Sequence, residues 1–174
     1  MDFWQTIDTR HSVRAFDPDV DVPSDTIARL LQAAIRAPSA GNRQPWHFYV
    51  VRDPDTRRGL AAAAWGQDFV AQAPVAIVVC ALPEQSAGRY GQRGRELYCL
   101  QDTAAAAEHI LLAAVALGLG GCWVGAFDEN QAAQVLGLPQ EHRPIAILPI
   151  GKPVSRSDTQ SSRQPLQRVV SYVE

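Results

Sequence analysis

The sequence predicts an α+β fold in which a small central mixed sheet surrounds a buried central helix and other helices flank it. Three short apolar runs, 47–52, 75–81 and 145–150, predict strands of this sheet. The run over 75–81 is apolar at every position, which is typical of a strand buried on both faces. A segment over about 95–117 is rich in alanine and apolar on nearly every side from residue 110, so it indicates the central helix.

The remaining elements of the first half are predicted from caps and periodicity. Helices are expected over 3–9, 24–36 and 54–65, and each begins next to a side chain that can accept a hydrogen bond from a helix N-terminus. These capping residues are Asp2, Ser24 and Asp53. A polar loop over 39–44 leads to the first strand, and Trp46 is expected in the core.

In the second half, residues 83–95 are polar and contain glycine, so they are expected to form a loop. A short strand is expected near 122–124, and Asp128 caps a helix that Gly137 closes. The tail over 153–168 is polar, and 169–173 resembles a last strand. The chain of 174 residues fits one domain over 1–174, and its extension over 153–174 is expected to wrap a partner subunit.

Composition excludes several classes of protein. The net charge is −2, so no global positive charge favours nucleic acid. The three cysteines lie far apart without a CxxC pair, which indicates reduced, buried thiols and a cytoplasmic protein. The uncharged stretch 110–127 contains four glycines that divide it into a helix, a turn and a strand, so no membrane span is expected.

The common catalytic and metal-binding patterns are absent from the sequence. Asp17, Asp19 and Asp21 are spaced like the start of a calcium loop, but Val22 and Ala28 stand where that loop needs glycine and glutamate. No close pair of histidines, nucleophile elbow or P-loop is present, and no metal site is predicted. A chain without an evident acid, base or nucleophile is expected to take its chemistry from a cofactor.

Three short segments are candidates for a binding site. Arg10-His11-Ser12-Val13-Arg14 offers charged and neutral donors to one phosphate, although a solvated basic turn reads equally well. The loop 38–46 combines small residues, an asparagine and two prolines that suit a planar ligand, and it is equally typical of a helix-to-strand connection. Glycines around 121–126 allow backbone to approach a flat ring, although a tight turn after the long helix is the simpler interpretation.

Taken together and in this order, these segments resemble the FMN-dependent nitroreductase family. The matching stretches are RHSVRAF at 10–16, PSAGNRQPWHF at 38–48, ALGLGGCWVG at 116–125, PIG at 149–151 and RQPL at 163–166. The resemblance covers nearly the whole chain and implies an intertwined homodimer with two FMN sites between the subunits. It also implies that a C-terminal strand is exchanged between them.

The resemblance assigns roles to particular residues. The phosphate of FMN would be bound by the basic segment and by one residue near the C-terminus, while the loop of the other subunit, one amide and one strand would contact the flavin ring. For the phosphate these residues are Arg10, His11, Ser12, Arg14 and Arg163; for the ring they are Pro38, Ser39, Asn42, Gln67, Trp123, Val124, Gly125 and Ala126. No catalytic side chain is implied, because flavin N5 carries the hydride.

The implied activity is an FMN-dependent NAD(P)H oxidoreductase, with NADH or NADPH as electron donor. Ping-pong hydride transfer would reduce a nitroaromatic, a quinone or a similar small-molecule acceptor. An alternative is a protein that stores FMN or senses redox state with little turnover, because the short region over 83–95 would leave the pocket open. A flavin-consuming or dehalogenating enzyme and a domain without cofactor are the remaining readings.

Overall fold

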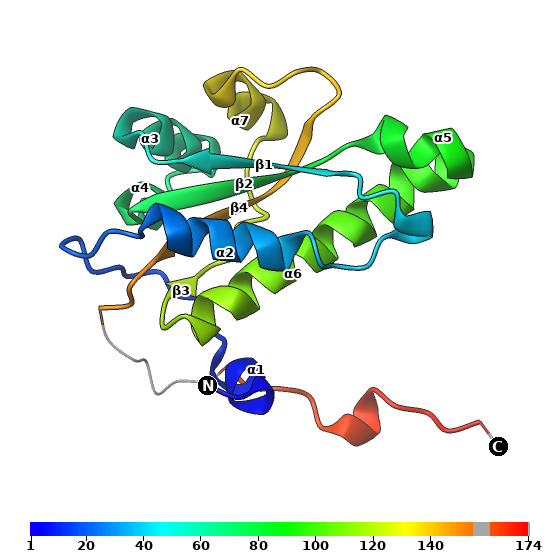
Figure 1. Cartoon of the computed structure of the whole chain (residues 1–174), viewed down its shortest axis with the longest axis horizontal. Coiled ribbons are helices and arrows are strands. Elements are labelled where there is room, and N and C mark those ends of the chain that lie inside the picture. The colour runs from blue at the N-terminus through cyan, green and yellow to red at the C-terminus, as the bar shows by residue number, and fades with distance from the viewer. Residues whose placement is uncertain (155–160, 174) are drawn as a thin grey trace.

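The computed structural model describes residues 1–154 and 161–173 and has helices on both faces of a four-stranded sheet (Figure 1). The helices are α1 (Phe3–Thr9), α2 (Ser24–Ala34), α3 (Pro54–Ala63), α4 (Phe69–Gln72), α5 (Pro83–Arg93), α6 (Cys99–Ala116) and α7 (Glu129–Leu136), with short turns η1 (Ala40–Asn42), η2 (Gly94–Tyr98) and η3 (Leu166–Arg168). The strands are β1 (Trp46–Val51), β2 (Val75–Ala81), β3 (Gly120–Gly121) and β4 (Arg143–Gly151). The α+β class is therefore confirmed.

The sheet has the order β1-β2-β4-β3, and every pair of named strands is antiparallel. The prediction of a mixed sheet is wrong for these strands. One isolated parallel bridge, between Ser12 and Gly121, adds the N-terminal segment beside β3. The connections between the paired strands are long and contain helices, so their length does not dictate the strand direction.

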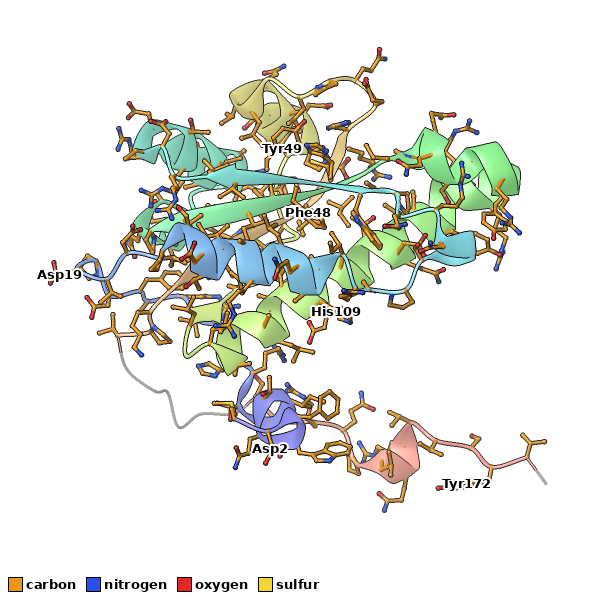
Figure 2. The ribbon with its side chains drawn as sticks, in the orientation of Figure 1. Asp2, Asp19, Phe48, Tyr49, His109 and Tyr172 are labelled. Atoms are coloured by element: carbon orange, nitrogen blue, oxygen red, sulfur yellow. The ribbon has the colours of Figure 1, made fainter. Side chains whose placement is uncertain are left out.

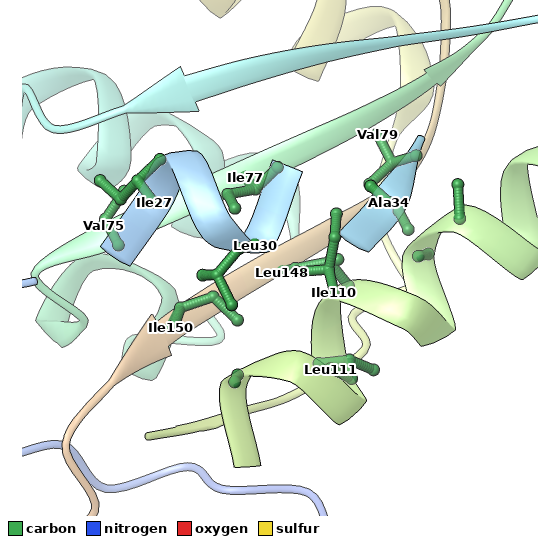
Figure 3. Packing of buried hydrophobic residues seen from close by; sticks show 14 of the residues in the cluster. Ile27, Leu30, Ala34, Val75, Ile77, Val79, Ile110, Leu111, Leu148 and Ile150 are labelled. Atoms are coloured by element: carbon green, nitrogen blue, oxygen red, sulfur yellow. The ribbon is translucent and has the colours of Figure 1, made fainter. Parts of the chain in front are cut away.

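Alternating residues of β2 supply two cores. Val75, Ile77 and Val79 face α2 and α6, where they pack with Leu30 and Ile110 (Figure 3). Ala76, Val78 and Cys80 face the opposite way, toward α3 and α7. Because all of β2 is buried on both faces, the continuous apolar run is explained, and the strand predicted over 75–81 is confirmed.

Residues 83–95 form no loop, which corrects the prediction from their glycine content. Pro83 begins α5, and Gly94 then enters the π-helical turn η2, so regular α6 begins at Cys99 instead of near residue 95. Gly91 interrupts α5 at φ 56° and ψ −140°. A Cβ on Gly94 would lie 2.6 Å from the Ser86 carbonyl oxygen, so glycine there permits close packing.

Two predicted strands also differ from the structure. The strand expected over 122–124 lies two residues earlier, as β3 (Gly120–Gly121), and Val124 makes only a single bridge with Ile147. The strand-like piece over 169–173 forms no strand within one chain and follows η3. A strand needs a neighbour with which to form hydrogen bonds, and the described tail pairs with no strand of its own chain.

Several local predictions are confirmed. Asp2, Asp53 and Asp128 each accept a hydrogen bond from a backbone N–H at the start of their helices, and Gly137 closes α7 in the left-handed conformation. The helix from Ser24 is present, but Ser24 is its first residue and its side chain makes no capping bond. Trp46 is buried, and all three cysteines are free and buried. In the described part of the chain, no helix is both long and apolar enough to cross a membrane.

Candidate functional site

The basic segment that follows α1 lies against β3. Arg10 ends α1, and its N–H donates to the Thr6 carbonyl at 3.1 Å. The Val13 N–H then donates to the Gly121 carbonyl at 2.9 Å. A Cβ on Gly120 would lie 2.5 Å from Val13 Cγ2, so the glycine allows this close approach. The segment is thereby held in an extended conformation along the sheet edge.

Arg10, His11 and Arg163 line one cavity of about 450 Å³. Its other lining residues are Ile7, Asp8, Glu108, Leu112 and Ser161. The Nε of Arg10 lies 3.6 Å from a Glu108 carboxylate oxygen, and Arg163 donates to the Ser161 carbonyl at 2.9 Å. The cavity thus gathers basic groups from both ends of the chain, with acidic side chains at its wall.

Arg14 and Ser12 lie on the same stretch but outside that cavity. The Arg14 guanidinium carbon is 5.9 Å from the centre of the Phe69 ring, a distance at which a cation–π contact stabilises the cation. Burial raises the pKa of Cys122, while the hydrogen bond with Ser12 and the charge of Arg14 oppose that rise. The positive field of the basic segment therefore reaches the residues that follow β3.

The segment over 123–126, which follows β3, presents unpaired backbone and forms only a single bridge at Val124. Val124 is bonded in both directions with Ile147 at 3.0 Å, whereas no described residue accepts a hydrogen bond from the exposed Gly125 or Ala126 N–H. Trp123 is 36% exposed, and a Cβ on Gly125 would lie 3.5 Å from its Nε1. Two donors at consecutive positions are therefore available to a ligand.

Gln67 connects this segment to the end of α3. Its side-chain Nε2 donates to the Ala64 carbonyl at 3.1 Å and to the Ala126 carbonyl at 3.0 Å. The turn before it is tight, since Trp65 and Gly66 have φ values of 56° and 79°. The structure therefore brings Gln67, the segment over 123–126 and the basic segment together in one region.

The loop that contains Pro38, Ser39 and Asn42 has a defined shape. The Ser39 hydroxyl accepts from the Gln44 N–H at 3.0 Å. Gly41 and Asn42 are left-handed, with φ values of 55° and 54°. The Ala40 N–H donates to Asp102 Oδ1 at 3.1 Å, which fastens the loop to the first turn of α6.

The loop does not meet the other candidate residues within one chain. Asp102 stands near the start of α6, whereas Arg10 lies beside Glu108 in the middle of that helix and Val13 lies beside Gly120, beyond its end. Six residues of helix, about 9 Å at ~1.5 Å per residue, separate Asp102 from Glu108, and the rest of the basic segment lies further on. One chain therefore carries two separated halves of the predicted site.

Sequence reasoning missed the residues that support the loop. Gln85 of α5 donates to the Arg43 carbonyl at 2.6 Å, and Arg43 Nε donates to the Gln85 carbonyl at 3.0 Å. Asp102 was a detectable signal, because it is a carboxylate within an alanine-rich helix. The contacts of Arg89 and Tyr90 with the loop had no local signal, since they depend on α5 being a helix.

These features define a region at a sheet edge in which basic side chains lie beside exposed, unpaired backbone. The chain belongs to the nitroreductase family, because the sequence profile of that family matches residues 7–67 and 61–152. An Archaeoglobus fulgidus protein whose name joins NADH dehydrogenase with NAD(P)H nitroreductase is 38% identical over 154 residues. That match covers 86% of this chain and 84% of the relative.

Solved structures agree with this assignment. The NADPH:FMN oxidoreductase of Vibrio harveyi, solved with NAD⁺, is 26% identical and has a TM-score of 0.88 over 98% of this chain and 76% of that one. A structure from Exiguobacterium sibiricum in complex with FMN has a TM-score of 0.90 at 22% identity, over 99% of this chain and 98% of that one. At that identity the second comparison shows the fold alone.

Proposed function

We propose that this protein is an FMN-dependent NAD(P)H oxidoreductase that reduces a nitroaromatic, a quinone or a similar electrophile. One observation carries the proposal: the basic segment over 10–14 pairs with β3, and the segment that follows β3 has free backbone donors at Gly125 and Ala126. The names of the Archaeoglobus and Vibrio relatives support the donor and the cofactor.

The donors present fit FMN. A phosphate dianion requires several charge-assisted hydrogen bonds, and Arg10 and Arg14 supply planar guanidinium groups for them. Ser12 adds a hydroxyl donor on the same stretch. His11 Nδ1 lies 2.9 Å from the Thr9 carbonyl oxygen, and Arg163 lies at the cavity that Arg10 and His11 line. The backbone of Gly125 and Ala126 offers hydrogen bonds to the polar edge of a flat ring without a titrating group.

Bound FMN would supply hydride chemistry that no side chain of this site supplies. The protein residues would bind FMN, orient its ring and polarise it. The arginines would fix the phosphate end, and the donors at 125 and 126 would favour negative charge at the ring. Because donor and acceptor would occupy the same place in turn, ping-pong kinetics are expected.

The site would be completed by a second copy of the chain. Within the described residues, no hydrogen bond or ion pair joins the loop with Pro38, Ser39 and Asn42 to the basic segment of its own chain, so the partner's loop would close the site. Phe3 and Trp4 of α1 are 64% and 72% exposed, and the tail extends away from the body with Tyr172 85% exposed (Figure 2). Such unburied aromatic surface is typical of an interface.

An anaerobic titration tests this function. The purified protein is expected to show flavin absorption bands, to bleach with NADH or NADPH, and to regain its colour when a quinone is added. Repeated cycles would support an enzyme, whereas a single slow cycle would favour storage or sensing of FMN. A colourless protein that takes up no added FMN would contradict the proposal.

A further inference from the structure

A cationic and aromatic surface lies on α5 and η2 beside the loop over 38–42. We call it the α5 patch and define it by Arg43, Arg89, Tyr90, Arg93 and Tyr98. Within the described ranges, none of its three arginines forms an ion pair with an acidic side chain. Nearby Glu84 is already paired with Arg95, at 2.7 Å. Glu96 of η2 accepts a hydrogen bond from Gln92 and pairs with none of the three arginines, so the patch keeps a net positive charge.

The aromatic rings order these cations. The guanidinium carbon of Arg89 is 5.5 Å from the centre of the Tyr90 ring, and that of Arg93 is 5.3 Å from the Tyr98 ring. The two tyrosine rings meet edge to face at 5.2 Å. Arg93 Nε also donates to the Tyr98 hydroxyl at 2.9 Å, and Arg43 Nε donates to the Gln85 carbonyl. These contacts orient the two arginines through Nε and leave their terminal N–H groups able to bind an anion.

The patch touches the loop that would complete the cofactor site. A Cβ on Gly41 would collide with the Tyr90 hydroxyl and would lie 3.1 Å from Arg89 Nη1. A Cβ on Gly88 would lie 3.6 Å from Arg43 Nη2, so Arg43 crosses over α5. A ligand that extends from the flavin across this loop would therefore contact the arginines and tyrosines of the α5 patch.

We propose that the α5 patch binds the phosphate end of the nicotinamide dinucleotide and favours NADPH over NADH. This inference rests on the function proposed above, because it assumes that the loop borders the flavin. A nicotinamide stacked on the flavin leaves its phosphates and adenosine to extend outward. NADPH carries one phosphate monoester more than NADH, and uncompensated arginines select such a group by charge and by paired hydrogen bonds. Tyrosine faces also suit an adenine ring.

Steady-state kinetics with Arg89→Gln/Arg93→Gln test the assignment. The wild type is expected to use NADPH with a kcat/KM about tenfold above that for NADH, as loss of one charge-assisted contact implies. The double variant should lose about tenfold for NADPH and less than about threefold for NADH. Arg58→Gln is the matched control, because Arg58 lies on α3, away from α5, and pairs with Asp55 (Figure 1).

Direct binding separates this proposal from the function on which it rests. Adenosine 2′,5′-bisphosphate should bind the wild type and the Arg58→Gln variant equally, and the double variant about tenfold more weakly. That titration needs no bound flavin, so it decides the role of the patch even if FMN binding fails. Equal binding by all three proteins would overturn the proposal, as would equal use of NADH and NADPH by the wild type. A loss confined to carboxylate-bearing acceptors would also overturn it and assign the patch to the acceptor.

Discussion

Asp102 combines burial with a role in positioning the loop. The residue is 7% exposed, and burial raises the pKa of its carboxyl above the ordinary 3.8, although the Ala40 N–H opposes the rise. A raised folded-state pKa means that the folded protein binds this proton more readily than the unfolded chain. The carboxylate therefore lowers stability as the pH rises from the unfolded toward the folded pKa.

Asp102→Asn should remove that pH dependence. Relative to the wild type, the free energy of unfolding of the variant is expected to increase as the pH rises from about 4, and to level off above the raised pKa. Urea denaturation over about pH 4 to 8 measures this difference. Asp19→Asn, in an exposed loop, is the control and should show no such trend (Figure 2). A difference for Asp102→Asn that stays constant with pH would argue against a buried charge.

The three thiols should be inert in the folded protein. Cys80 and Cys99 are fully buried and Cys122 is 2% exposed, and burial raises the pKa of Cys80 to about 12. A thiol reacts as its thiolate, so both access and ionisation are suppressed. A chromogenic disulfide reagent near neutral pH is expected to modify none of them at first and all three after denaturation. Immediate reaction of any thiol in the native protein would contradict their burial.

At the scale of elements, the sequence was sufficient to predict helices and strands whose ends are marked by capping residues or by the limits of an apolar run. The strand over 75–81, the helix over 3–9 and the capped helix that ends at Gly137 were predicted correctly, because caps and apolar runs lie within each segment. Helix α5 was missed, because its glycines argue for a loop and its support comes from Arg43, 42 residues before Gln85. Tertiary contact here overrides local propensity.

The candidate site divides in the same way. The order of the motifs and the family resemblance predicted that the basic segment, Gln67 and the segment over 123–126 belong to one site. The structure places these three close together. Their contacts with FMN remain predictions. Asp102 and its bond to Ala40 join positions 62 residues apart, so periodicity and spacing gave no sign of that pairing.

Replacing the cations of the basic segment tests its assigned role. Arg10→Gln/Arg14→Gln should weaken FMN binding about 10- to 100-fold per lost contact, since a hydrogen bond to a charged group contributes about 1.5–3 kcal/mol. Riboflavin lacks the phosphate, so its binding should change little. Fluorescence titration with both ligands measures the two affinities. Arg29→Gln, on the exposed face of α2, is the control. Equal weakening for FMN and riboflavin would place these arginines away from the phosphate.

At the scale of the whole molecule, the loop half of the site is fastened near the start of α6, and the basic half runs from beside Glu108 to beyond the end of that helix. A twofold dimer would place the loop of each chain at the basic segment of the other, because the same surface patches meet in both directions. Each site would then contain residues from two chains. This arrangement makes a prediction that no single variant can test.

Mixing two defective variants should restore part of the FMN binding. One variant is Arg10→Gln/Arg14→Gln, and the other is Gly41→Val, which strains a residue at φ 55° and collides with Tyr90. In a heterodimer, one site combines the two intact halves and the other site combines the two defective halves. Random exchange gives about one half heterodimers, so about one quarter of all sites should bind FMN normally. Co-expression with two affinity tags, followed by measurement of bound flavin per dimer, checks this fraction. If both halves came from the same chain, every site in the mixture would carry one defect, and mixing would restore none.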